Sequence, residues 1–133
     1  MIQPILAAVT LVGLMLGPVQ AQGPAPGPAM PEGAAPAAPP TQAERQKNNA
    51  AKIAGLVGFV RVHCPDLRPN DERFRSVVAG LGVRFEALEE GDLRLRALSY
   101  MEAYAKDIPA SCARAEENFG KDGRTLPDLI AKR

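Results

Sequence analysis

The chain has little of the chemistry that metal centres and nucleophilic catalysis need. Its 133 residues include one histidine, His63, and two cysteines, Cys64 and Cys112. A tetrahedral zinc site takes four such ligands, so these three side chains cannot supply one. A nucleophilic cysteine needs a histidine aimed at it, whereas neighbours in a helix point about 100° apart. We therefore expect no metal, no cofactor, no catalytic residue and no enzyme activity.

An excess of charge of one sign is also absent. All 16 Lys and Arg residues and 14 of the 15 acids fall within residues 41–133, which leaves this region a formal charge of +2. Proteins that bind nucleic acid usually carry a clustered basic face, so we expect no nucleic-acid partner. An acidic group does occur near the expected helix ends, and it fits a solvated surface better than an acid–base pair. Its members are Glu86, Glu89, Glu90 and Asp92.

One long apolar run is present, at the N-terminus. It extends from Ile5 to Leu16 and is followed by Val19-Gln20-Ala21, which suits signal peptidase. We expect a signal peptide over residues 1–21, cleavage after Ala21, and a periplasmic or secreted protein. The alternative is an uncleaved membrane anchor, although a span needs about 20 apolar residues. Residues 22–40 are rich in Pro, Ala and Gly, and they predict a disordered linker.

Residues 41–133 predict one all-α domain, a bundle of four to five helices. A capping box at Thr41–Glu44 begins the first helix, and Pro65 ends it at Cys64. Further helices are expected at 71–80, 93–107 and 109–119, with a single turn at 84–90 and a short closing turn near the C-terminus. We expect Asn70 and Asp92 to cap the second and third of these helices.

The helix at 93–107 has the widest apolar face, which favours a position in the middle of the bundle. This face is the candidate contact surface for a partner. It comprises Leu93, Ala97, Tyr100, Met101 and Tyr104.

The two cysteines predict a structural disulfide. Cys64 and Cys112 each fall on the apolar face of an expected helix. An exported chain enters an oxidising compartment, where an even cysteine count indicates a disulfide framework. The bond would join the first helix to the last long one and stabilise the domain by roughly 4 kcal/mol in the chain-entropy description.

Three segments, VRVHCP, DIPASCARAEENFG and GRTLPDLIAKR, carry a resemblance. Over most of residues 45–133 the chain resembles small, largely uncharacterised exported helical proteins of Gram-negative bacteria. Through Cys64, Cys112 and Asn118-Phe119 it is also distantly similar to the HdeA-type periplasmic acid-stress chaperones. That resemblance implies stress protection through contact with other proteins.

The expected function is therefore that of an exported, non-enzymatic module. It binds an envelope protein of unknown identity or protects proteins under stress. The alternative is a structural envelope spacer, held at the membrane by an uncleaved N-terminal anchor. The sequence specifies no oligomeric state.

Overall fold

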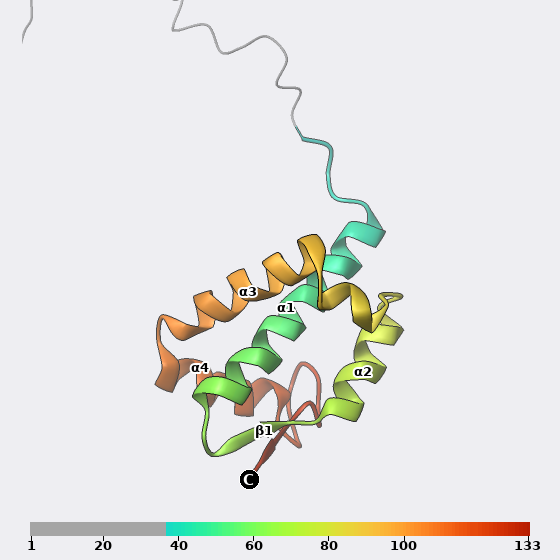
Figure 1. Ribbon diagram of the computed structural model, residues 1–133. Coiled ribbons are helices and arrows are strands. Elements are labelled where there is room, and N and C mark those ends of the chain that lie inside the picture. Colours follow the sequence, from blue (N-terminus) through green and yellow to red (C-terminus); the bar gives the residue numbers. More distant parts are fainter. Residues whose placement is uncertain (1–36) are drawn as a thin grey trace, which may run out of the picture. The chain divides into compact units, whose positions relative to one another are not determined.

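Helix α1 (Gln42–His63) is the element around which the other elements pack. The computed structural model describes residues 37–133, and in it α1 contacts α2, α3, α4 and the strand β1 on different sides (Figure 1). Residues that are buried lie almost all the way round this helix. They are Ala50, Ala51, Gly55, Leu56, Val57, Phe59 and Val60.

The expectation that the helix at 93–107 occupies the middle of the bundle is wrong. Helix α3 (Gly91–Ala105) has one buried residue, Ala97, and its apolar Leu95 and Leu98 are 66% and 43% exposed. Its apolar stripe is wide because it continues past the buried interface onto the solvent face. A wide stripe is therefore compatible with a peripheral helix.

The first two helix starts are as predicted. The Thr41 hydroxyl accepts a hydrogen bond from the Glu44 amide at 3.2 Å, and α1 ends at His63. At α2 (Asp71–Gly80), the Asn70 side chain accepts from the Arg73 amide at 3.1 Å. The single turn is a 3-10 helix, η1 (Phe85–Leu88).

The later helix starts differ from the prediction. Glu90, not Asp92, precedes α3, and the Asp92 carboxylate pairs instead with Arg96 at 2.8 Å, one turn further on. Helix α4 (Ile108–Phe119) is capped by Asp107, whose side chain accepts from the Ala110 amide at 3.1 Å. The sequence reading assigned Asp107 to the preceding helix and so missed this cap.

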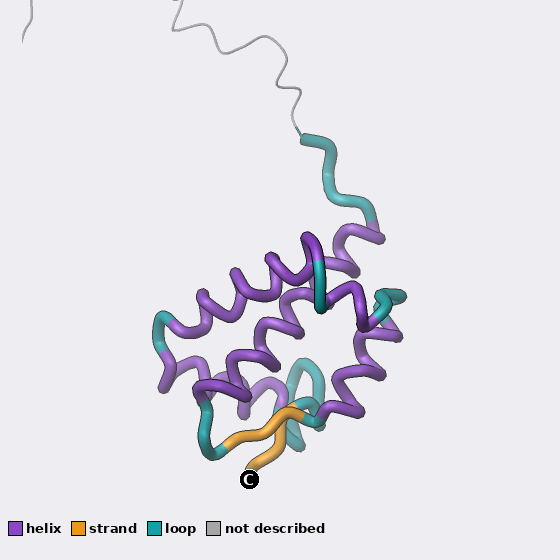
Figure 2. Tube along the Cα trace, in the orientation of Figure 1, coloured by secondary structure: helices purple, strands orange, loops and turns teal. Residues whose placement is uncertain are grey.

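The structure is mainly helical but not strictly all-α. Of the described residues, 65% are helical and 6% belong to an antiparallel ribbon of β1 (Leu67–Pro69) and β2 (Ile130–Lys132) (Figure 2). Leu67 pairs with Lys132, and Pro69 pairs with Ile130. The expected closing turn is therefore a strand. Its Ile130 is buried, which fixes the C-terminus to the core.

Helices α1 and α3 run in the same direction and approach closely at Gly55. A Cβ atom there would lie 2.5 Å from the Ala97 carbonyl oxygen and 2.7 Å from the Tyr100 Cβ. These separations are shorter than van der Waals contact, so only glycine fits. The position of Gly58 is more open, because the nearest atom to a Cβ there is the Met101 sulfur at 3.4 Å.

The predicted signal peptide at 1–21 and the predicted linker up to residue 36 lie outside the described residues. Between residues 37 and 133, no helix is both long enough and apolar enough to cross a bilayer.

Candidate functional site

The predicted disulfide between Cys64 and Cys112 is confirmed. The two Cα atoms lie 5.8 Å apart, and the bond ties the end of α1 to the first half of α4. The neighbouring His63 is half-buried, and its ring lies 5.3 Å from the ring of Phe59. His63 and Cys64 thus both have structural contacts.

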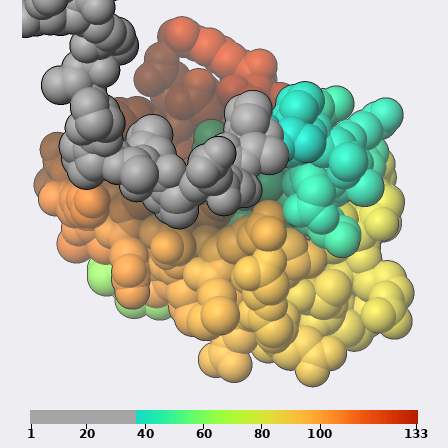
Figure 3. Space-filling view, turned by 90° about the horizontal axis from the view of Figure 1, so that it is seen from above, coloured from blue at the N-terminus to red at the C-terminus, as the bar shows by residue number. Residues whose placement is uncertain are grey.

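The five predicted contact residues of α3 face α1 in the folded protein. Ala97 is buried, while Leu93, Met101 and Tyr104 are half-buried and pack on the core. Tyr100 donates a hydrogen bond from its hydroxyl to the Asn48 side chain at 3.1 Å. These side chains form the α1–α3 interface. Figure 3 shows the outer surface that α3 (orange) forms beside the segment before it (yellow) and the first turns of α1 (cyan).

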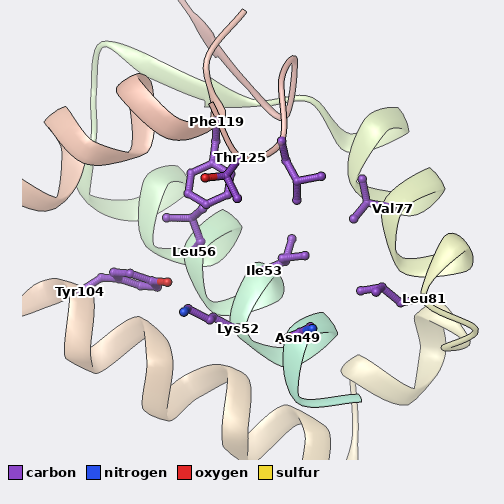
Figure 4. A pocket seen from close by; sticks show the side chains of 10 residues that line it. Asn49, Lys52, Ile53, Leu56, Val77, Leu81, Tyr104, Phe119 and Thr125 are labelled. Carbon is purple, nitrogen blue, oxygen red and sulfur yellow. The ribbon is translucent and has the colours of Figure 1, made fainter. Parts of the chain in front are cut away.

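A groove of about 320 Å³ lies on another side of α1 (Figure 4). Side chains from α1, α2, α3 and the end of α4 with its following loop line it. Most of the lining is apolar, and the apolar residues are Ile53, Leu56, Val77, Leu81, Phe119 and Leu126. The remaining lining residues are Asn49, Lys52, Tyr104 and Thr125.

Helical spacing explains the α1 side of the groove. Asn49, Lys52, Ile53 and Leu56 are three, one and three residues apart, which places them along one stripe of the helix. Val77 of α2 and Leu81, the residue that follows this helix, are four residues apart and form the opposite wall. The sequence therefore determines which side chains of each helix face the groove.

Two polar groups lie together at one edge of the groove. In Figure 4 the Lys52 nitrogen and the Tyr104 hydroxyl lie toward one another, whereas Asn49 lies apart from them near Ile53 and Thr125 lies beside Phe119. Burial, with a smaller contribution from Tyr100, raises the pKa of Tyr104 above 10.0, so this hydroxyl is a hydrogen-bond donor at neutral pH. None of the ion pairs formed within residues 37–133 uses Lys52.

Hydrogen bonds hold two walls of the groove together. The Asn70 amide donates to the Leu129 carbonyl at 2.8 Å, and the Arg73 Nε donates to the Pro127 carbonyl at 3.3 Å. Both bonds join the start of α2 to the loop that follows α4. The groove is therefore part of the folded structure and needs no rearrangement to form.

Sequence reasoning did not find the groove. Of the lining residues, Tyr104 belongs to the apolar face named above for the helix at 93–107, and Ile53, Val77, Leu81 and Phe119 have the apolar character of core residues. Lys52 and Asn49 were missed. The feature of the sequence that could have indicated them is a pair of polar residues beside the apolar stripe of α1.

Comparison with known proteins adds no relative. No family model matches the chain, and no curated protein or solved structure matches it either. The two resemblances drawn from the sequence stay predictions.

Proposed function

We propose that the protein is an exported, non-enzymatic binding module that takes an apolar group into the groove between α1, α2, α3 and the end of α4. The observation that supports this proposal is the groove itself. Its volume of about 320 Å³ and its mainly apolar lining with a few polar groups resemble sites for small ligands, which occupy about 300–1,000 Å³. The disulfide supports an oxidising compartment and hence export.

The groove is a better candidate site than the face of α3 that the sequence indicated. Apart from Tyr104, which also lines the groove, that face packs against α1, so a partner could reach it only after the α1–α3 interface had opened. The groove is open in the folded protein. Binding there requires no unfolding step, which would reduce the affinity.

A neutral apolar dye, N-phenyl-1-naphthylamine, tests this function. We expect saturable binding to the folded protein at neutral pH, measured by dye fluorescence excited beyond the tryptophan band. Thr125→Trp and Val77→Phe add bulk at the groove and should each weaken binding at least tenfold. Ser76→Trp, at an exposed position of α2 that does not line the groove, is the matched control.

Thermal unfolding of each variant verifies that the protein is folded. Dye binding that is absent, or that is equal in the groove variants and the control, would show that the groove is not a binding site.

A further inference from the structure

We infer that the occupant of the groove is a medium-chain fatty acid, with its alkyl chain along the apolar lining and its carboxylate at the edge formed by Lys52 and Tyr104. This inference rests on the proposed function and names the ligand class for the same site. The inference follows from the apolar lining of the groove, from the positive charge of Lys52 and from the position of the polar groups in the groove.

The apolar part of the groove is suited to a flexible hydrocarbon chain. Ile53 and Leu56 of α1 lie between Val77 and Leu81 on one side and Phe119 on the other. Among the polar lining residues, Lys52 and Tyr104 lie together where α1 and α3 meet, Thr125 belongs to the loop after α4, and α2 contributes only the apolar Val77. A ligand that fits this division has a polar head at one end and a long apolar body.

The charge of the groove selects an anionic head. Lys52 is the only charged lining residue, and the described lining contains no acidic side chain. A lysine ammonium and a tyrosine hydroxyl both donate hydrogen bonds, and an ionised carboxylate only accepts them. These two donors, one of them positively charged, match one carboxylate, and they disfavour a cationic head of the same chain length.

Displacement of the bound dye measures the preference for the head and the chain. Dodecanoate should displace the dye at a concentration about tenfold lower than dodecanol, because a charge-assisted hydrogen bond is worth about that factor or more. Dodecyltrimethylammonium should bind more weakly than either. From octanoate upward, each added methylene should tighten binding about fourfold until the chain outgrows the groove.

Variants at Lys52 test whether this lysine binds the carboxylate of the fatty acid. Lys52→Met keeps the length of the side chain and removes its charge, so it should weaken dodecanoate binding about tenfold and change dodecanol binding less than twofold. Lys52→Arg should retain the preference for the carboxylate. Lys47→Met is the matched control, because Lys47 lies on the same helix, pairs with Glu44 and does not line the groove.

The tyrosine adds a second variant. Tyr104→Phe removes the hydroxyl and keeps the ring that packs against Phe59, with centroids 5.7 Å apart. It should weaken dodecanoate binding more than dodecanol binding.

The outcomes separate this inference from the function on which it rests. If the dye binds in the groove but dodecanoate binds no better than dodecanol, or Lys52→Met behaves like Lys47→Met, the fatty-acid inference is overturned and the binding function stands. A peptide with an apolar free C-terminus that displaces the dye better than every fatty acid also overturns it. Failure of the dye itself to bind refutes the proposed function first.

Discussion

The close approach of α1 and α3 at Gly55 gives a sharp test of the packing. Replacing Gly55 with Ala places a Cβ atom 2.5 Å from the Ala97 carbonyl oxygen, 2.7 Å from the Tyr100 Cβ and 3.1 Å from the Met101 amide nitrogen. Two of these three atoms belong to the backbone of α3. A rotamer change cannot relieve the overlap, so the two helices must separate.

The magnitude follows from two opposing effects. Overpacking a core costs about 1–3 kcal/mol, and the obligatory backbone shift puts this site toward the upper end. Replacing a helical glycine with alanine returns up to about 1 kcal/mol through helix propensity. We therefore expect Gly55→Ala to lower the free energy of unfolding by about 1–2 kcal/mol.

Gly58→Ala, one turn further along the same helix, is the matched control. The nearest atom to its Cβ is the Met101 sulfur at 3.4 Å, which lies near the end of a flexible side chain. The gain in helix propensity should survive there, so Gly58→Ala should be neutral or stabilising by up to about 1 kcal/mol.

Urea unfolding followed by circular dichroism measures both variants. A difference of about 2 kcal/mol between them corresponds to roughly 10 °C in Tm for a domain of this size. If Gly55→Ala is as stable as Gly58→Ala, then α1 and α3 do not meet at Gly55 and the packing described here is wrong.

Two further predictions concern the disulfide and Tyr104. Replacing Cys64 and Cys112 together with Ala should lower the free energy of unfolding by about 2–5 kcal/mol. In urea unfolding, a reducing agent should destabilise the native chain and leave this variant unchanged; insensitivity of the native chain would contradict a stabilising bond. In Tyr100→Phe, which leaves Tyr104 as the one tyrosine, tyrosinate absorbance should titrate with a midpoint above pH 10.0 because burial raises the pKa. Since the folded pKa exceeds the unfolded value, the contribution of Tyr104 to stability is present below pH 10.0 and is lost as the pH rises through the folded pKa. A midpoint at or below 10.0 would place its hydroxyl in water.

Local signals in the sequence were sufficient for most helix boundaries. The caps at Thr41 and Asn70 act on amides three residues away, and Pro65 restricts only the residue before it. Such effects act over a few neighbouring residues, so they can be recognised from the sequence alone. Asp107 was missed because an acidic residue between two apolar stretches fits a helix end and a helix start equally well.

The ribbon could not be predicted in the same way. Leu67 and Lys132 pair across more than sixty residues of chain, and each strand has three residues. A three-residue strand is too short to show an alternating pattern, and its pairing depends on where the loop after α4 returns. The central position of α1 was hidden for a related reason. Small residues such as Ala51 and Gly55 do not add to an apolar stripe, yet they are buried where α3 approaches.

The groove was beyond sequence reasoning because its walls belong to segments that meet only in the folded chain. Val77, Tyr104 and Phe119 are apolar or aromatic residues of three different helices, and such residues can equally well be packed in a core. Whether such residues close against one another or leave a space depends on the distances between helices. The polar edge of the groove was easier to predict from the sequence, because Lys52 lies next to Ile53 on the same stripe of α1.

A response to acid would begin at ion pairs on the surface. Protonating carboxylates removes the pairs Asp71–Arg61, Glu44–Arg96, Glu116–Lys132 and Glu117–Arg124, which join different segments. Exposed pairs contribute little individually, and the α1–α3 interface depends on the packing at Gly55. Asp71–Arg61 links α1 to α2, Glu44–Arg96 links α1 to α3 in addition to the packing at Gly55, and the other two pairs hold β2 and the loop after α4. Because α2 and that loop are two walls of the groove, we expect acid to loosen the groove before it separates α3 from α1.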